Sequence, residues 1–378
     1  MTTRGTLRLA TRSSDLALRQ AASVREALED RRFDVELVEV ETRGDQIRDE
    51  LIHRLGKTGA FVRALDEQVL DGDVDAAVHS MKDMPTEGPD DLVVAGVPQR
   101  AAAADLLLTP DGTELRDLPS GSVVGTSSLR RKAQLLAERP DLEVEPLRGN
   151  VDTRIEKLLA PDLQAEHERR VDADRDEKGE AGRNDSGNDG TDSTDEESDR
   201  EFDESIEEWF DGLAEIERRA LERELDVEYD AVVLAEAGLR RAGLLHHVEY
   251  ARLDPATFVP APGQGAIAVT ARADGDAAEE IRSVVDHPRT RVETTVERTV
   301  LAELGGGCIA PIGVHAKLQG EYVHTVARVL SGDGEVEVAA SRDLPVDDHA
   351  NAAAAFASDL ADRGADDLIA EAREAAEE

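Results

Sequence analysis

The chain has 378 residues, a single cysteine at position 308 and a formal net charge of −40. One cysteine excludes an internal disulfide and a zinc site built from four cysteines. The acidic balance argues against nucleic acid as a partner, because phosphate contacts need a basic face. The sequence has neither a signal-peptide pattern at its start nor an apolar run of about 20 residues, so we expect a cytoplasmic protein with no membrane partner.

Acidic side chains outnumber basic ones, and the basic ones are mostly arginine. The chain carries 84 acidic side chains against 44 basic ones, and only six of the bases are lysine. We interpret this as a salt-adapted surface of the haloarchaeal type, because molar salt screens the self-repulsion of such a surface. A group of arginines is therefore informative wherever it occurs. The length predicts two or three domains.

The first hundred residues alternate between strand and helix patterns. We expect strands over 6–12, 34–45, 74–80 and 91–98, with helices over 13–30 and 60–72, the first capped by Ser13 or Ser14. This alternation predicts an open α/β sheet whose ligands bind at the carboxyl ends of the strands.

The α/β pattern restarts near residue 122 and gives way to a different one near the C-terminus. Strand-to-helix patterns recur over 122–139, 142–160 and 229–244, which predicts a second α/β domain. Two helices are expected over 276–285 and 288–304, the second ending at the glycine-rich loop of Cys308. Antiparallel strands over 314–320, 322–330 and 335–343 and one final helix follow.

One segment interrupts this rhythm. Between residues 172 and 201 the only apolar residues are Ala173 and Ala181, so we expect disorder there. Residues 202–225 place apolar side chains at helical spacing. This pattern indicates either a surface helix docked on its own domain or a helix that binds a partner.

Polar side chains gather where predicted strands end. Hydroxyl groups at a strand-to-helix turn and the N-termini of helices attract anions, and arginine forks bind carboxylates in a bidentate manner. We therefore expect a polyanion to bind in a cleft of this acidic protein. The residues concerned are Arg12, Ser14, Lys82, Asp83, Thr126, Ser127, Ser128, Arg130, Arg131, Arg148, Arg154, Arg240 and Arg241.

Three single residues allow more than one interpretation. Asp83 is either an ion-pair or capping residue or a catalytic carboxylate at the end of a strand. Cys308 is either a small buried side chain or an exposed thiol, and its glycine-rich loop favours the second. His79 has no cysteine or second histidine at metal-binding spacing, so we expect no metal site.

Eight stretches of the chain carry these residues. In order they are LATRSSDLAL, VETRGD, VHSMKDMP, VGTSSLRRKAQL, LRGNVDTRIEKL, LAEAGLRRAGL, APGQGA and GGGCIAPIG. Together they closely resemble the porphobilinogen deaminase family, also called hydroxymethylbilane synthase. The resemblance implies a transferase of tetrapyrrole biosynthesis that condenses four porphobilinogen molecules head to tail with loss of ammonia, after which water releases hydroxymethylbilane. The resemblance also implies a dipyrromethane cofactor attached through a thioether to Cys308.

The family's site residues carry over to positions of this sequence. Asp83 matches the catalytic aspartate, which contacts pyrrole N–H groups, assists proton transfer and stabilises the cationic azafulvene left by deamination. The cofactor would be held by Lys82, Asp105, Thr126, Ser127, Ser128, Arg130 and Arg131. Carboxylates of the substrate and of the growing chain would be held by Arg12, Ser14, Arg148, Arg154 and Arg241.

The resemblance also implies three domains, the first two similar to the lobes of type II periplasmic binding proteins. Domain 1 would comprise 1–98 and 266–283, domain 2 would comprise 104–259 with an acidic insertion over about 161–228, and domain 3 would be an α+β unit over 288–378. We expect a monomer whose partner is the small molecule porphobilinogen. The family's lysine-rich loop departs here, with Arg54, Lys57 and Thr58 at the positions concerned.

Two rival functions would use the same residues differently. A two-lobed anion-binding protein without catalysis would need the arginines but neither Asp83 nor Cys308. A thiol enzyme would use Cys308 as a nucleophile and would need a general base beside it.

Overall fold

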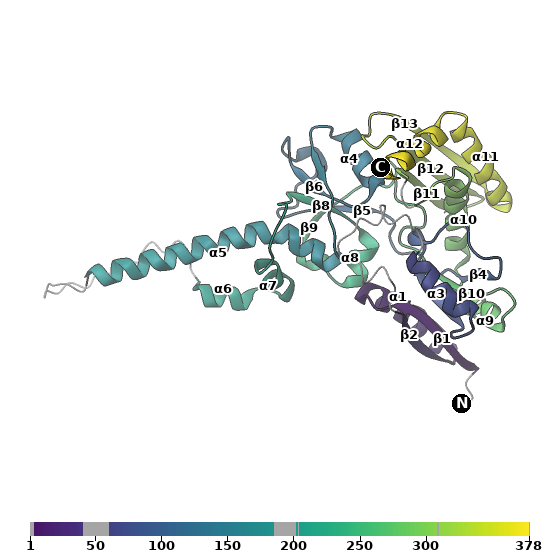
Figure 1. The fold of residues 1–378 in the computed structure, drawn as a ribbon, viewed down its shortest axis with the longest axis horizontal. Coiled ribbons are helices and arrows are strands. Elements are labelled where there is room, and N and C mark those ends of the chain that lie inside the picture. Colours follow the sequence, from purple (N-terminus) through teal and green to yellow (C-terminus); the bar gives the residue numbers. More distant parts are fainter. Residues whose placement is uncertain (1–3, 41–59, 185–201, 203, 308–309, 378) are drawn as a thin grey trace.

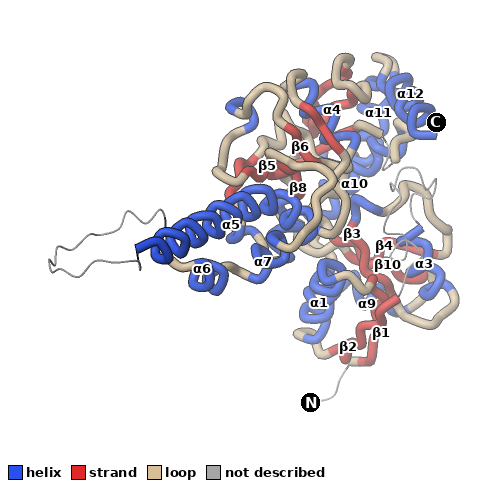
Figure 2. Tube along the Cα trace, turned by 60° about the vertical axis from the view of Figure 1, so that its left-hand side comes forward, coloured by secondary structure: helices blue, strands red, loops and turns tan. Residues whose placement is uncertain are grey.

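The computed structural model describes residues 4–40, 60–184, 202, 204–307 and 310–377. These residues form two five-stranded mixed sheets and one three-stranded antiparallel sheet, all covered by helices (Figures 1 and 2). The predicted fold class, α/β with a smaller α+β unit at the C-terminus, is confirmed. None of the helices in the described part of the chain is long and apolar enough to cross a membrane.

The first sheet joins four strands from the first hundred residues with one strand from residues 267–272. Its order is β2-β1-β3-β10-β4, in which β1 runs parallel to β2 and β3 while β10 runs antiparallel to β3 and β4. Helices α1 (Asp15–Glu29) and α9 (Asp276–Val285) pack on one apolar face, and α3 (Ala60–Leu70) packs on the other. The strands are β1 (Gly5–Arg12), β2 (Phe33–Val40), β3 (Ala76–Ser80), β4 (Leu92–Gly96) and β10 (Ile267–Arg272).

The second sheet repeats the same pattern of directions. Its order is β7-β6-β8-β5-β9, with β6 parallel to β7 and β8 and with β5 antiparallel to β8 and β9. Helices α4 (Leu129–Glu138), α5 (Val151–Asn184) and α8 (Glu236–Ala242) accompany it. The strands are β5 (Asp105–Thr109), β6 (Val123–Gly125), β7 (Glu143–Glu145), β8 (Ala231–Ala235) and β9 (Glu249–Arg252).

Two segments carry the chain between these sheets, residues 97–104 on the way out and residues 253–266 on the return. We call them the crossing segments. They meet where the Ala101 N–H donates to the Gly265 carbonyl at 3.1 Å. Gly265 has φ +83°, and a Cβ there would lie 2.7 Å from the Ala101 oxygen, so only glycine fits this approach. The strand ends that bear the predicted site residues therefore lie beside a tightly packed crossing.

The third unit is a small antiparallel sheet with its own core. Strands β11 (Ile312–Gln319), β12 (Tyr322–Leu330) and β13 (Glu337–Pro345) pair in that order. Helix α10 (Pro288–Glu303) packs on it together with α11 (His349–Ala361) and α12 (Ala365–Glu377). The single final helix that we expected is wrong. The first of two helices ends at Ala361, and Gly364, with φ +91°, lies in the turn before the second.

Helix α5 departs from the sequence-based expectation. We expected disorder from residue 172 onward, but the helix continues to Asn184 and extends away from the rest of the molecule (Figure 1). Ion pairs one turn apart support it, including Glu166 with Arg170 at 2.8 Å and Asp172 with Arg175 at 3.3 Å. Alanine, glutamate and arginine also favour helix. The remainder of the expected disordered segment, residues 185–201, lies outside the described residues.

The apolar pattern over 202–225 forms two short helices instead of one, α6 (Ile206–Gly212) and α7 (Glu215–Leu221). The break at residues 213–214 occurs because α7 has its own cap, in which Glu217 accepts the Ala214 N–H at 2.6 Å. The Trp209 ring stacks on His167 of α5 at 6.1 Å, and Ile216 is buried in the core beside the second sheet. Helix α7 therefore docks on its own domain, whereas none of the residues of α6 is fully buried, and binding of a partner stays a prediction.

Candidate functional site

The residues predicted to carry the chemistry begin at the end of β3. A 3-10 helix over Met81–Asp83 follows this strand directly. Met81 and Met84 are buried among apolar side chains, and the Met81 N–H donates to the Ala266 carbonyl at 3.1 Å. The intervening Lys82 is half-buried and Asp83 is exposed. The two methionines thus anchor the turn and leave both charged side chains outside the apolar core.

The hydroxyl-rich turn before α4 serves two purposes. Ser128 caps the helix, and its own N–H donates to Thr126 Oγ1 at 3.2 Å. Thr126 is buried, and the Ser127 hydroxyl donates to the Leu147 carbonyl through a short hydrogen bond. The hydroxyl groups of all three residues are therefore engaged in backbone hydrogen bonds or helix capping. Of the three residues, only Ser128 lines the cavity described below.

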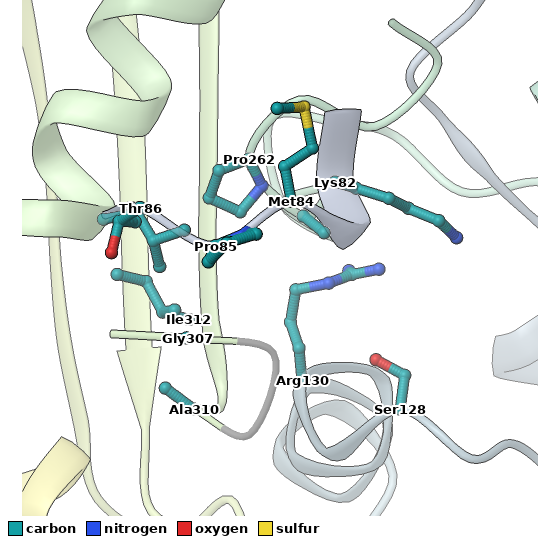
Figure 3. A pocket seen from close by; sticks show the side chains of 12 residues that line it. Lys82, Met84, Pro85, Thr86, Ser128, Arg130, Pro262, Gly307, Ala310 and Ile312 are labelled. Atoms are coloured by element: carbon teal, nitrogen blue, oxygen red, sulfur yellow. The ribbon is translucent and has the colours of Figure 1, made fainter. Parts of the chain in front are cut away.

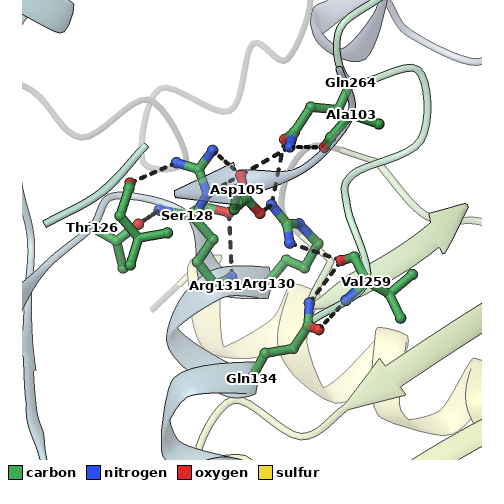
Figure 4. Close-up of polar contacts among 10 residues, drawn as sticks. Ala103, Asp105, Thr126, Ser128, Arg130, Arg131, Gln134, Val259 and Gln264 are labelled. Atoms are coloured by element: carbon green, nitrogen blue, oxygen red, sulfur yellow. Dashed lines mark hydrogen bonds and ion pairs between the residues drawn. The ribbon is translucent and has the colours of Figure 1, made fainter. Parts of the chain in front are cut away.

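Arg130 and Arg131 converge on one buried carboxylate, that of Asp105 at the start of β5 (Figure 4). Arg130 Nη2 lies 2.7 Å from Asp105 Oδ2, and Arg131 Nη2 lies 2.8 Å from Oδ1. Gln264 of the second crossing segment donates to the same Oδ1 at 2.8 Å. Arg130 Nη1 donates to the Val259 carbonyl, and Arg131 Nη1 donates to the Val233 carbonyl. This network ties α4 to the crossing and to the second sheet.

The charge on Asp105 is stable in this setting. Burial alone would raise the pKa of its carboxyl, but Arg130 and Arg131 outweigh burial and hold the pKa at about 2. Asp105 is fully buried, so its carboxylate orients the two arginines and does not itself face the cleft. The family resemblance had grouped Asp105 with the arginines, and the structure shows their contact.

A cavity is lined by residues from both lobes, from the second crossing segment and from the third unit (Figure 3). It encloses ≈ 70 Å³ within a space of ≈ 500 Å³ that includes the part open to solvent. One side is formed by Lys82, Ser128 and Arg130, and the other by Gly307 and Ala310, which flank position 308. Cys308 itself lies outside the described residues, so the structure places its neighbours against this cavity and leaves its thiol undescribed.

Several cations crowd the same region. Arg154, at the start of α5, donates through Nε to the Gly149 carbonyl at 2.9 Å. Burial and the nearby Arg131 lower the pKa of Arg154 to about 10, while Asp83 opposes that shift. Asp83 is also the strongest influence on the pKa of Lys82 and raises it, yet burial together with Arg131 and Arg154 leaves it below its usual range. The structure therefore brings Lys82, Asp83, Arg131 and Arg154 into one electrostatic neighbourhood.

The other predicted binding residues lie around this centre. Arg12 and Ser14 stand at the junction of β1 and α1, and neither lines the cavity. Arg148 precedes α5. Burial and then Arg223 lower the pKa of Lys157 most, and Arg154 and Arg148 add to the same shift. Arg241 of α8 donates to the Gly265 carbonyl at 2.7 Å, and burial lowers its pKa.

Two further expectations concern ligands and the family's lysine-rich loop. Among the described residues, no group of three or more His, Cys, Asp or Glu side chains is arranged to hold a metal ion. Positions Arg54, Lys57 and Thr58 of the loop lie outside the described residues.

One buried charge was not anticipated from the sequence. Glu297 of α10 is fully buried and pairs with Arg100 of the first crossing segment at 2.7 Å. It also accepts the N–H groups of Gly263 at 2.7 Å and Ala316 at 2.9 Å. Burial would raise the pKa of Glu297, but Arg100 and then His315 hold it at about 2. The sequence shows only a glutamate within a predicted helix, and this pattern does not reveal that the side chain is buried or that Arg100 is its partner.

The fold and the site together define a class of protein: two similar α/β lobes joined by a double crossing, with a cationic cleft bounded by a third unit. The chain belongs to the porphobilinogen deaminase family. The family's "Porphobilinogen deaminase, dipyromethane cofactor binding domain" matches residues 7–166 and 213–280, and its "Porphobilinogen deaminase, C-terminal domain" matches residues 292–361. The cofactor of this family is dipyrromethane. The unmatched stretch within the second lobe, 167–212, is shorter than the 161–228 expected from the motifs.

Relatives cover nearly the whole chain. A "Probable porphobilinogen deaminase" of Halobacterium salinarum is 56% identical over 97% of this chain and 98% of its own. A "Porphobilinogen deaminase" of an Exiguobacterium species is 33% identical over 96% and 97%. Among solved structures, the methionine-binding protein MetQ is 12% identical and covers 74% of this chain and 89% of its own, with a TM-score of 0.35. A TM-score of this size supports no conclusion about function.

Proposed function

We propose that this chain condenses porphobilinogen molecules head to tail, releasing one ammonia for each carbon–carbon bond formed, and finally releases hydroxymethylbilane by hydrolysis. The growing chain would start from a dipyrromethane attached to Cys308, which makes the enzyme a hydroxymethylbilane synthase. The observation that carries this proposal is the cavity between Gly307 and Ala310 on one side and Lys82, Ser128 and Arg130 on the other. It joins the neighbours of the cysteine to the turn that bears Asp83.

The residues around the cavity fit such a group. Each pyrrole of a dipyrromethane bears an acetate and a propionate, so the cofactor is a polyanion. Asp83 raises the pKa of Lys82, but burial and then Arg131 and Arg154 lower it, and burial and then Arg131 lower the pKa of Arg154. Arg131 therefore lies close enough to both cations to disfavour their charge. A polyanion would relieve that repulsion. Because the enclosed volume is only ≈ 70 Å³, most of the group would lie in the open part of the cleft.

When bound, the cofactor supplies the terminal pyrrole carbon to which the chain is extended. The protein's side chains would hold it in two ways. Lys82, Ser128 and Arg130 line the cavity and can contact it directly. Asp105, Thr126 and Ser127 would act by orienting those neighbours, since their polar atoms are engaged within the protein. Arg131, which Asp105 holds, contributes positive charge to the same cleft.

Asp83 would serve the chemical step. Positive charge develops on the substrate pyrrole as ammonia leaves, and a carboxylate fixed beside it stabilises that charge. The 81–83 helix holds Asp83 at the strand end, where its side chain is exposed and acts on the charges of Lys82 and Arg154. We assign Arg12, Ser14, Arg148, Arg154 and Arg241 to the carboxylates of the substrate and of the elongating chain.

We extend the proposal to organisation. The lobes would be domain 1, residues 1–98 and 266–283, and domain 2, residues 104–259, with domain 3 over 288–378. We also assign a monomeric state to the enzyme. We assign the enzyme to the cytoplasm.

The test is single-turnover ammonia release from porphobilinogen by cofactor-loaded protein. Asp83→Asn keeps the shape and removes the charge, so the rate should fall about 10²- to 10³-fold. Asp83→Glu keeps a displaced charge and should retain more activity than Asp83→Asn. Intact mass must first show equal cofactor loading in all three proteins. Equal rates for the parent and Asp83→Asn would show that the carboxylate is structural, and no ammonia from the parent would favour the rival anion-binding protein.

A further inference from the structure

An arginine of the third unit holds the turn that carries Asp83. Arg298 lies on α10, more than 200 residues away in sequence from that turn. Its Nη1 donates to the carbonyls of Met81 at 3.4 Å and Met84 at 3.3 Å, and its Nη2 donates to the Pro85 carbonyl at 2.6 Å. One guanidinium thus binds both ends of the short helix that carries Lys82 and Asp83.

The turn needs such a donor. After Asp83 the backbone leaves the helical conformation at Met84, with φ −79° and ψ 137°, so its last carbonyls have no following turn to pair with. Buried carbonyl groups require partners, and hydrogen bonds from a charged guanidinium are stronger than those from neutral donors. Arg298 therefore fixes the backbone on which Asp83 is mounted.

The same helix leads to the loop of Cys308. Helix α10 ends at Glu303, and Gly307, four residues later, already lines the cavity. One residue before Arg298, Glu297 binds both crossing segments through Arg100 and the Gly263 N–H. A single rigid element thus contacts the Asp83 turn, both crossings and the start of the cysteine loop.

We propose that Arg298 is a positioning residue that sets the place of Asp83 relative to the loop that would carry the cofactor. The inference rests on the proposed function, because it assumes that Asp83 acts on a substrate joined to that loop. Loss of Arg298 should leave binding of porphobilinogen largely intact and slow the chemical step, since a displacement of about 1 Å can cost about 10²-fold in rate.

The same helix provides a matched control. Arg291 also donates from α10 to backbone carbonyls of the first lobe, those of Val94 at 3.1 Å and Ala95 at 3.3 Å. It differs in holding strand β4 and in pairing with Asp286 at 2.6 Å. Arg291→Gln therefore loosens the same interface without touching the Asp83 turn.

The experiment compares the parent with Arg298→Gln, Arg298→Lys and Arg291→Gln, all as full-length protein loaded with cofactor. The first measurement is hydrogen exchange of the Met81 and Met84 amides, which are bonded to the carbonyls of Ala266 and Met81. These amides should exchange about tenfold faster in Arg298→Gln and at the parental rate in Arg291→Gln. This measurement does not depend on activity.

The second measurement is steady-state turnover. Arg298→Gln should lower kcat by about 10²-fold with KM within a few-fold of the parent. Arg298→Lys should recover part of kcat, because an ammonium still donates to carbonyls but lacks the planar fork. Arg291→Gln should keep the parental kcat. Unchanged exchange at Met81 and Met84 in Arg298→Gln overturns the proposal, as does a loss of kcat in Arg291→Gln equal to that in Arg298→Gln.

The two measurements separate this inference from the proposed function. A parent that releases no ammonia contradicts the proposed function, while the exchange rates still show whether Arg298 holds the turn. If Arg298→Gln does not fold, Arg298→Lys carries the same comparison, with faster exchange and lower kcat expected and parental values of both contradicting the proposal.

Discussion

Replacement of Asp105 by Asn removes one negative charge from a fully buried cluster and changes the shape of the side chain little. The pKa of Asp105 is held at about 2 against an ordinary 3.8, a difference worth roughly 2.5 kcal/mol of folding free energy. Arg130 and Arg131 would also remain buried without a charged partner. Breaking a buried pair in this way costs about 3 to 5 kcal/mol. At about 2 to 4 °C per kcal/mol for a cooperative unit of about 150 to 250 residues, we expect the midpoint of thermal unfolding of that unit to fall by roughly 6 to 20 °C.

The loss should depend on pH with a definite sign. Because the folded-state pKa of Asp105 lies below its ordinary value, its contribution is fully present above about pH 4 and disappears as the pH falls toward 2. Thermal unfolding of the parent and of Asp105→Asn, measured at several pH values in molar salt, should give curves that differ most near neutral pH. The two midpoints should converge in acid.

A surface pair provides the control for this measurement. Asp141 also has a pKa of about 2, mainly through its hydrogen bonds with Arg139, but its side chain is 38% exposed. Solvent screens exposed pairs of this kind and they contribute little to stability, so Asp141→Asn should change the unfolding midpoint little. If Asp105→Asn lost no more stability than Asp141→Asn, the argument that the buried network holds α4 to the crossing would be refuted.

Two further predictions concern the cleft and the acidic insertion of the second lobe. Replacement of Arg148 or Arg154 by Leu should slow elongation and leave shorter enzyme-bound intermediates on native mass spectra; an unchanged ladder in both variants would reject their assignment to carboxylate binding. Deletion of residues 172–201, which lie in the stretch that the family model leaves unmatched, should keep specific activity in high salt within a few-fold of the parent. A larger loss with the fold intact would show that this segment contributes to the chemistry.

Local elements were predictable because their signals lie close together in the chain. The strand-to-helix turn at β6 and α4 follows from an apolar run, a capping serine and a helical pattern, and the structure places Ser128 at the N-cap. The length of helix α5 was underestimated because the composition from residue 172 onward argued for disorder, while the ion pair of Asp172 with Arg175, one turn apart, favours continuation of the helix. The break between α6 and α7 depends on the cap at Ala214, which a search for apolar spacing overlooks.

Long-range partners could not be predicted in the same way. Residue type and position marked Arg130 and Arg131 of α4 as anion-binding, yet the carboxylate that both contact belongs to Asp105 at the start of β5. Contacts of Arg298 with Met81, Met84 and Pro85 join segments more than 200 residues apart, and no local pattern encodes them. Motif order identified the family, whereas the division between side chains that line the cavity and those that orient them required the folded structure.

The intact mass of the protein tests the central claim most directly. Active protein purified from cells that make porphobilinogen should have a mass larger than that of its sequence by two pyrrole units. The Cys308→Ala variant should carry no such addition and should not start a chain. An active parent preparation with the mass of the bare polypeptide, or a dipyrrole still attached to Cys308→Ala, would contradict it.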